Sequence, residues 1–443
     1  MKLYLHLIHS NHMYKVVISV VMFGLIGCPQ NITVSNTAKL NALAEQYVRL
    51  GLTIGQYDAD FVDAYYGPDS LKPTGTPPAN FPKDSLLSAV ESLTSALHAF
   101  DSTANDTLAK RAEWIQAQLK AFAERIRIFS GEMASFDGES KELFGVQAPV
   151  YDEQHYKQII SKLDSLLPGK GGINGRFQQL ADRFIIPKDK LDTVFKTSIA
   201  ECRKRTLQHY RLPANESFTL EYVTNKPWSG YNWYKGHYKS IIQINTDLNI
   251  FIDRAIDVGS HESYPGHHVY NMLLEKNLYV DKGWVEISLY PLFSPQSLIA
   301  EGSANYGIDV AFPGEEKIAF AKNTLLPLAG LDTSGINLYF KALELRSDLN
   351  YARNEVGRGL LNNTMHESQA IQWLKDYCLM NDETAKKSIS FIRKNRSYVI
   401  NYNYGKDLVA DYISANGGEA SIEKKWEVFG ELLSNEIMTT DLK

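Results

Sequence analysis

One short segment constrains the fold more than any other, because residues 261–268 read His-Glu-Ser-Tyr-Pro-Gly-His-His. Three imidazoles and a carboxylate within eight residues are the donor types that zinc prefers. Pro265 and Gly266 interrupt a regular helix here, since proline clashes with the carbonyl four residues earlier and glycine tolerates unusual dihedral angles. A fold that uses these side chains together must therefore bend the chain between His261 and His267.

A second segment, Ala-Glu-Gly-Ser-Ala-Asn-Tyr at residues 300–306, follows about forty residues later. A catalytic zinc site needs three protein ligands and one position open to water. The predicted ligands are His261, His267 and Glu301. The predicted general base is Glu262, which would point about 100° away from its helical neighbour and so lie beside the metal. The alternatives are a polar helix end with chance histidines and, for Glu301, a carboxylate at the start of a surface helix.

Either His267 or His268 could join His261 on the metal. An unbroken helix would rotate His267 about 240° from His261, and it would place His268 nearly in line but about 10 Å along the axis. If the Pro-Gly pair forms a two-residue bulge, its removal restores His-Glu-x-x-His with His267 as the second histidine. We therefore predict His267 as ligand and His268 as a neighbour that packs or holds substrate; a kink that swings His268 inward is the alternative.

Further side chains are candidates to support the site. Asn305 lies four residues after Glu301 on the same helical face, where its amide oxygen could accept a hydrogen bond from Nδ1–H of a ligand histidine. A helix-surface asparagine is the alternative. Tyr264, within the motif, is a candidate to contact substrate. Three others could hold an oxyanion or a terminal carboxylate, with a surface or core role as the alternative: Arg396, Tyr398 and Tyr402.

Apolar spacing predicts a mainly α-helical fold. The chain has 443 residues, of which 44% are hydrophobic, enough for one large domain or two lobes. Its net charge of −5, without a basic block, argues against a nucleic-acid partner. Helical spacing covers residues 40–62, 84–100, 105–130, 152–167, 174–184, 188–211, 298–308, 333–360, 367–379, 383–396, 405–415 and 421–436.

The period changes just upstream of the histidine segment. Residues 217–223 and 238–245 alternate polar and apolar side chains, as half-buried strands do. They predict a small antiparallel sheet next to the helix that carries His261. Strand 238–245 either offers a free edge to an extended peptide or lies inside the sheet. Residues 225–230 read as a turn, and 137–149 as irregular.

The N-terminus reads as a bacterial lipoprotein signal. An apolar run over residues 16–26 follows Lys15 and ends Leu-Ile-Gly-Cys at Cys28, which resembles a lipobox. Residues 1–27 are then the signal peptide, 28–36 the lipidated cysteine and tether, and 37–443 the helical domain, with lobes 37–211 and 212–443. A plain secretory signal is the alternative, and translation could start at Met1 or Met13. The remaining cysteines, 202 and 378, could pair or stay as buried thiols.

The two motifs together resemble a large bacterial family of predicted metallopeptidases marked by HExxPGHH and a later EGxA. That family is formally a domain of unknown function and is grouped with the gluzincin-type zinc peptidases. Residues 57–68, 226–234 and 402–405 resemble its other signatures. Two departures concern the substrate pocket: Ser303 stands where many members have Trp, and a Pro-Gly-Gln upstream of Tyr402 is missing.

The resemblance implies a helical fold with a central cleft, a zinc cofactor and peptide hydrolysis. The expected function is thus an extracytoplasmic, lipid-anchored zinc peptidase of short peptides. One alternative is a peptide- or solute-binding lipoprotein with a structural or absent metal. The other is a zinc amidase that acts on a non-peptide amide. Glu262 favours an enzyme, because a binding protein needs no base beside the metal ligand.

Overall fold

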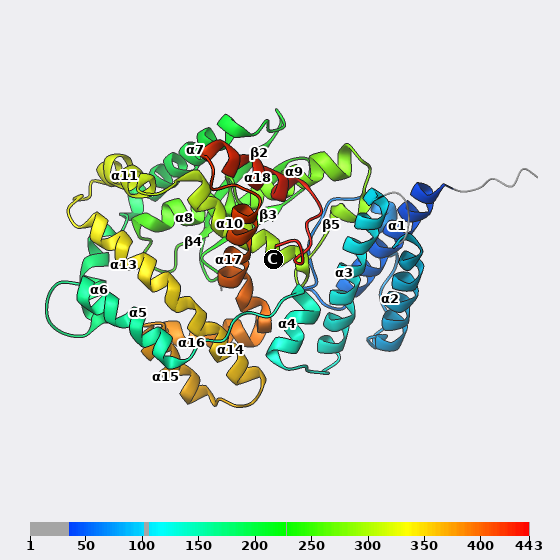
Figure 1. The fold of residues 1–443 in the computed structure, drawn as a ribbon, viewed down its shortest axis with the longest axis horizontal. Coiled ribbons are helices and arrows are strands. Elements are labelled where there is room, and N and C mark those ends of the chain that lie inside the picture. Colours follow the sequence, from blue (N-terminus) through cyan, green and yellow to red (C-terminus); the bar gives the residue numbers. More distant parts are fainter. Residues whose placement is uncertain (1–34, 102–105, 227, 443) are drawn as a thin grey trace, which may run out of the picture.

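The structure, a computed structural model, describes residues 35–101, 106–226 and 228–442 (Figure 1). The predicted signal peptide, the lipobox cysteine and most of the tether lie outside these ranges. Within them the fold is mainly helical with small sheets, as the apolar spacing predicts. No helix in the described part of the chain is long and apolar enough to cross a membrane.

Most helices bury one face, since their buried residues recur three or four positions apart. In α1, for example, Leu40, Ala44, Tyr47 and Val48 are fully buried. The helices are α1 (Asn36–Gly55), α2 (Lys83–Leu97), α3 (Asp106–Phe129), α4 (Phe136–Phe144), α5 (Glu153–Leu166), α6 (Ile173–Ala181), α7 (Leu191–His209), α8 (Ile252–Glu262), α9 (His267–Leu274), α10 (Pro295–Ala311), α11 (Glu316–Phe320), α12 (Leu326–Ala329), α13 (Ile336–Asp348), α14 (Ala352–Leu361), α15 (Glu367–Tyr377), α16 (Asp382–Asn395), α17 (Ile400–Ala415) and α18 (Ile422–Ser434).

Three helical predictions need correction. The predicted helix 40–62 ends at Gly55, and Val62 begins a strand. The predicted helix 333–360 is two helices, α13 and α14, joined by a 3₁₀ turn over Leu349–Tyr351. Residues 137–149, predicted irregular, begin inside the short helix α4. Ser135 caps this helix by accepting from the Gly138 amide (3.2 Å), and Gly145 ends it with φ 74°. Nine residues are too few for periodicity to mark a helix.

A three-stranded sheet lies beside α8 and α9, in the order β2 (Ser217–Val223), β4 (Lys239–Asn245), β3 (Gly230–Tyr234). The β3–β4 pair is antiparallel, whereas β2 and β4 run parallel. The antiparallel pairing predicted for 217–223 with 238–245 was therefore wrong. The turn-rich segment between them contains β3, which reverses the chain before β4 begins. Because β4 is the central strand, it has no free edge for a peptide.

A second, two-stranded ribbon joins the N-terminal part of the chain to its middle. Strand β1 (Val62–Tyr65) pairs antiparallel with β5 (Leu289–Pro291). Val62 lies opposite Pro291 and Ala64 opposite Tyr290. The register shifts between these pairs, so Asp63 is an extra residue in β1.

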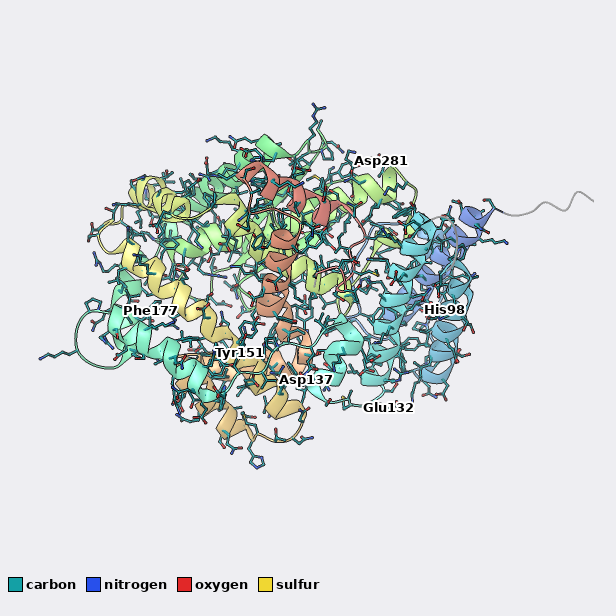
Figure 2. All side chains as sticks on the ribbon, viewed as in Figure 1. His98, Glu132, Asp137, Tyr151, Phe177 and Asp281 are labelled. Atoms are coloured by element: carbon teal, nitrogen blue, oxygen red, sulfur yellow. The ribbon has the colours of Figure 1, made fainter. Side chains whose placement is uncertain are left out.

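Contacts between residues far apart in sequence also tie α4 and the segment after it to α14 and the turn before it. Arg358 donates from Nε to Asp137 (2.9 Å), which Figure 2 labels, and from Nη2 to the carbonyl of Ala148 (2.6 Å). The ring of Tyr151 packs edge-on against Tyr351, with centroids 5.2 Å apart. These contacts pack two parts of the chain that lie about 200 residues apart. The two described cysteines, 202 and 378, are buried free thiols.

Candidate metal centre

Helix α8 positions the first two site residues. Its apolar face buries Ile252, Ala255 and Ile256 against neighbouring helices, of which α7 and α10 make the most contacts. The helix ends at Glu262, and a new helix, α9, begins at His267. The Pro-Gly pair is thus not a bulge within one continuous helix, as the spacing argument assumed. The chain leaves the helix over residues 263–266, where the Tyr264–Pro265 peptide bond is cis.

Gly266 lets the chain fold back onto the end of α8. A Cβ atom at this position would lie 2.0 Å from the carbonyl oxygen of His261, so only glycine fits without a shift of the backbone. The Gly266 amide donates to the carbonyl of Ser260 (3.2 Å). This close approach brings Nε2 of His267 to 3.1 Å from Nε2 of His261.

Helix α10 carries Glu301 in its middle rather than at a surface helix start. Its neighbour Gly302 packs directly on Gly405 of α17, where a Cβ atom on residue 302 would lie 2.3 Å from the Gly405 carbonyl oxygen. Helices α10 and α17 consequently pack over an extensive contact near the centre of Figure 1. The contact places Asn305 of α10 against Tyr402 of α17.

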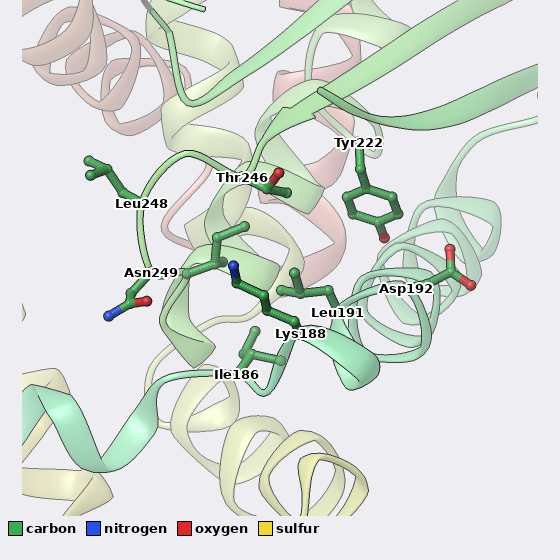
Figure 3. Close-up of a pocket in the computed structure, with 9 residues that line it drawn as sticks. Ile186, Lys188, Leu191, Asp192, Tyr222, Thr246, Leu248 and Asn249 are labelled. Carbon is green, nitrogen blue, oxygen red and sulfur yellow. The ribbon is translucent and has the colours of Figure 1, made fainter. Parts of the chain in front are cut away.

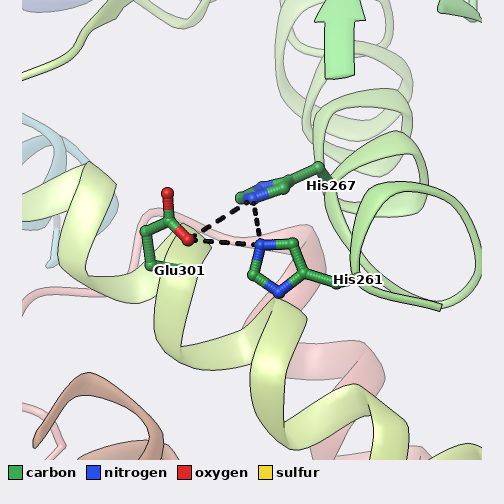
Figure 4. A group of neighbouring side chains, drawn as sticks. All are labelled: His261, His267 and Glu301. Carbon is green, nitrogen blue, oxygen red and sulfur yellow. Dashed lines mark hydrogen bonds and ion pairs between the residues drawn. The ribbon is translucent and has the colours of Figure 1, made fainter. Parts of the chain in front are cut away.

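His261, His267 and Glu301 converge on one space (Figure 4). Glu301 Oε2 lies 3.3 Å from His261 Nε2 and 3.7 Å from His267 Nε2. One potential ligand atom from each residue lies within 4.8 Å of the other two. Two imidazoles and one carboxylate at this separation are a donor set suited to zinc.

Asn305 determines which nitrogen of His261 faces this space. The Asn305 amide donates from Nδ2 to the carbonyl of Tyr402 (2.9 Å), which leaves its Oδ1 as an acceptor 3.0 Å from His261 Nδ1. His261 must therefore donate from Nδ1, and the neutral ring carries its lone pair on Nε2. This is the tautomer that can bind a metal through Nε2.

Oε2 of Glu301 is a second atom whose electron pairs accept no hydrogen bond. Tyr398 donates to Oε1 (2.9 Å), whereas Oε2 is buried without a hydrogen-bond partner. Burial by itself would raise the pKa of Glu301, but His261 and His267 hold it well below its usual value. Oε2 of Glu301 and Nε2 of both histidines face one another, and each of the three atoms offers an electron pair when both rings are neutral. A bound cation would satisfy all three, so these residues fit a metal ion.

Glu262 lies beside this group but points to a different neighbour. It is 6% exposed, and Gly230 of β3 packs against it, since a Cβ there would lie 3.0 Å from Oε1. Asn232 donates to its backbone carbonyl (2.6 Å). Burial raises the pKa of Glu262 to about 7, with His261 opposing and Glu301 adding to the shift. A carboxyl group in this setting can exchange a proton near neutral pH.

His268 and Tyr264 turn away from the ligand group into a separate polar network. His268 is fully buried, with Nδ1 2.8 Å from Ser240 Oγ and Nε2 3.2 Å from Glu216 Oε2. Glu216 also accepts from the Tyr264 hydroxyl (2.5 Å) and from Arg203 Nε (2.8 Å). The network anchors both sides of the turn between α8 and α9.

The three C-terminal candidates, Arg396, Tyr398 and Tyr402, also differ in whether they contact the ligand group. Arg396, in a left-handed backbone conformation (φ 56°), donates from Nε to the buried Glu139 (2.6 Å). It therefore anchors the 3₁₀ turn Arg396–Val399, which carries Tyr398 to Glu301. The Tyr402 hydroxyl has no hydrogen-bond partner among the described residues. Burial raises its pKa well above the usual value, so it stays protonated and can donate.

No protein-family model and no curated protein matches this sequence. Solved structures match by fold. A predicted lipoprotein from Colwellia psychrerythraea aligns with TM-score 0.52 and 13% identity, over 81% of this chain and 68% of its own. Metallocarboxypeptidase 1 from Trypanosoma cruzi aligns with TM-score 0.43 and 10% identity, over 89% of this chain and 90% of its own. The first likeness shows a shared fold, and membership of the HExxPGHH family stays a prediction.

Sequence reasoning missed several residues around the site. Asp63 of β1 accepts a hydrogen bond from Tyr231 of β3. Burial raises the pKa of Asp63, and the charges of His267 and Glu301 also act on it. Asp63 and Tyr231 lie in segments that carry the family resemblance, 57–68 and 226–234, which was the available signal. No sequence signal pointed to Glu216, because it is a single carboxylate in a turn.

A hollow on the described surface is separate from the ligand group. A pocket of about 320 Å³ lies between the start of α7, β2 and the loop before α8 (Figure 3). Its polar lining includes Lys188, Asp192 and Asn249, with Leu191 and Tyr222 beside them. No residue of the candidate metal centre lines it.

Proposed function

We propose that this chain is a zinc-dependent metallopeptidase that cleaves short peptides outside the cytoplasm, anchored to a membrane by a lipid on Cys28. The convergence of His261 Nε2, His267 Nε2 and Glu301 Oε2, with Glu262 beside them, carries the proposal. The anchor rests on the apolar run that ends at Cys28. The cleft and the division into two lobes stay predictions.

Each residue of the centre has a distinct task in this reaction. Zinc held by His261, His267 and Glu301 would supply a water molecule of lowered pKa and polarise the substrate carbonyl. Glu262 takes a proton from the attacking water and delivers it to the leaving amine. Asn305 keeps Nε2 of His261 free of its proton.

Tyrosines complete the proposed site. Tyr398 holds Glu301 through Oε1, so that Oε2 stays directed at the histidines. Tyr402 offers a protonated hydroxyl without another partner, and it is the candidate to donate to the carbonyl oxygen as negative charge develops there. This role requires that substrate bind between Tyr402 and the ligand group.

Metal analysis followed by a peptide-library cleavage profile, with and without chelator, tests the function. We expect about one zinc per chain, cleavage that a chelator abolishes, and recovery on addition of zinc. A binding lipoprotein would retain peptides without cleaving them, and an amidase would cleave only non-peptide amides. Purified protein that holds no zinc and leaves every peptide intact would contradict the proposal.

Glu301→Ala tests the ligand set. It removes the only carboxylate in the group, so we expect zinc to be lost on dialysis while wild type retains it. The matched variant is Glu262→Gln, which leaves all three ligands in place and should keep its zinc. Equal zinc content in Glu301→Ala and wild type after dialysis would refute this ligand assignment.

A further inference from the structure

Asp63 occupies a position that redirects its side chain. In the β1–β5 ribbon, Val62 and Ala64 have partners on the opposite strand, and Asp63 between them is the extra residue of a bulge. Bulges turn a side chain out of the regular alternation and are common next to active sites. The Asp63 carboxylate accepts a hydrogen bond at Oδ1 from the hydroxyl of Tyr231 on β3. Its orientation is therefore fixed from a second sheet.

The ribbon and β3 both adjoin the candidate metal centre. Tyr290, opposite Ala64, accepts a hydrogen bond from Ser297 (3.4 Å), which lies one turn before Glu301 in α10. Strand β3 runs past Glu262, which contacts the residues on either side of Tyr231. Burial raises the pKa of Asp63, the hydrogen bond from Tyr231 opposes the shift, and the charges of His267, Glu301 and Lys235 also act on it, in keeping with this placement.

Asp63 nevertheless lacks a cationic partner. It forms no ion pair with any residue that the structure describes, and Oδ2 has no hydrogen-bond partner there. The residue is partly exposed, so water or substrate can reach it. The neighbouring carboxylates have other tasks in the proposed reaction, Glu301 as ligand and Glu262 as base. A partly desolvated carboxylate is most stable beside a cation, and the one missing here can be supplied by the substrate.

We propose that Asp63 binds an ammonium group of the substrate, held in place by Tyr231, so that the enzyme prefers peptides with a protonated amine close to the scissile bond. This inference rests on the proposed peptidase function and adds its substrate class. The amine can come from two sources. One is the free N-terminus of a peptide, in which case the enzyme is an aminopeptidase, and the other is a lysine side chain.

Matched peptides identify the amine. One pair has the same sequence with a free or an acetylated N-terminus, and a second pair is acetylated and carries lysine or norleucine beside the scissile bond. We expect wild type to favour the amine-bearing member of at least one pair by about ten- to a hundredfold in kcat/KM, the range of one charge-assisted hydrogen bond. Asp63→Asn should remove that preference. Equal turnover within both pairs by wild type, or a preference that survives in Asp63→Asn, would overturn the inference.

Two controls separate recognition from assembly of the site. Asp60→Asn changes a carboxylate three residues earlier that pairs with Lys394 at the surface (3.2 Å), and it should keep the preference. Zinc content should be equal in wild type, Asp60→Asn and Asp63→Asn. Loss of zinc from Asp63→Asn alone would overturn the proposal, since Asp63 would then orient the metal centre instead.

Binding gives a readout that does not depend on turnover. Calorimetry of the zinc-loaded protein with leucine hydroxamate, lysine hydroxamate and their fully acetylated forms measures the amine contribution directly. We expect at least tenfold tighter binding of one amine-bearing form, lost in Asp63→Asn. If wild type cleaves no peptide, the proposed function fails, yet an amine preference that depends on Asp63 still supports this inference. Equal binding of free and acetylated forms contradicts it whatever the turnover.

Discussion

The imidazole of His261 can bind a metal through Nε2 only if that nitrogen carries a lone pair. Asn305 ensures this, because its Nδ2 is already committed to the Tyr402 carbonyl and only its oxygen can face His261. Glu301 is oriented by a similar division, with Oε1 held by Tyr398 and Oε2 left free. The residues around the ligands thus decide which atoms face the metal space.

At this scale, Glu262→Gln tests the base. Glutamine keeps the shape of the side chain but cannot accept the proton, so we expect zinc content to stay at the wild-type value while kcat falls about 10²- to 10⁴-fold. Zinc analysis and initial rates on one peptide check both expectations. Turnover at the wild-type rate would show that another group is the base.

The two adjacent histidines should respond in opposite ways to substitution. His267→Ala removes a ligand, and we expect the zinc to be lost. His268→Ala leaves the ligand group intact but deprives Ser240 and Glu216 of a buried partner, which should lower the free energy of unfolding by about 1–3 kcal/mol. Zinc analysis and urea unfolding of both variants decide. Retention of zinc by His267→Ala together with its loss from His268→Ala would reverse the assignment.

At the scale of elements, the crossing of α10 and α17 sets the position of Glu301. The two helices approach closely because glycines 302 and 405 meet where any larger residue would collide. The same contact brings Asn305 and Tyr402 together. The crossing therefore positions the proposed ligand Glu301, its neighbour Asn305, and Tyr402, which is a candidate to contact substrate.

Gly302→Ala should therefore disturb both the fold and the metal site. The added methyl group would lie 2.3 Å from the Gly405 carbonyl oxygen and force the helices apart, at a cost of about 1–3 kcal/mol. We expect a lower free energy of unfolding and weaker zinc retention. Gly175→Ala, in α6 with open space around it, is the control and should be neutral or stabilising. Equal behaviour of the two variants would contradict the importance of the crossing.

The turn between α8 and α9 depends on Glu216, whose ionisation links it to pH. Burial opposes ionisation, but hydrogen bonds from His268, Tyr264 and Arg203 lower the pKa of Glu216 from 4.5 to about 2. A lowered pKa stabilises the folded state above pH 4.5, and this contribution is lost as pH falls towards 2. The difference in unfolding free energy between wild type and Glu216→Gln should thus be largest near neutral pH and shrink below pH 4.5. Urea unfolding from pH 3 to 7 measures it, and a constant difference would refute the linkage.

At the scale of the whole molecule, segments that are far apart in the sequence pack against one another. The buried ion pair between Arg111 of α3 and Glu286, just before β5, connects the N-terminal helices to the ribbon, and both side chains are at most 1% exposed. The ribbon in turn carries Asp63 towards α10 and the ligand group. If Asp63 binds substrate as proposed, the N-terminal part of the chain is a component of the site.

Cys28→Ser tests where the molecule works. If the apolar run ending at Cys28 is a lipoprotein signal, the variant should leave the membrane fraction or remain uncleaved, because serine cannot carry the thioether-linked lipid. Membrane fractionation and intact mass report both outcomes, and His268→Ala, altered only inside the domain, serves as a control. Normal attachment and maturation of Cys28→Ser would exclude lipidation at this residue.

The local pattern of the sequence determined the helical class, the two alternating strands and the gathering of histidine and glutamate types. These follow from neighbours three, four or two positions apart, which periodicity records. Tertiary structure alone decided the parallel pairing of β2 with β4, the break between α8 and α9 that stands in place of the predicted bulge, and the arrival of Asp63 and Glu216. Each of these depends on how far a turn reverses the chain or how closely distant backbones approach. The strand pairing and the contacts of Asp63 and Glu216 join residues from tens to hundreds of positions apart, which no short-range spacing encodes. The return of the chain at His267 depends on how closely residues 263–266 fold onto the end of α8.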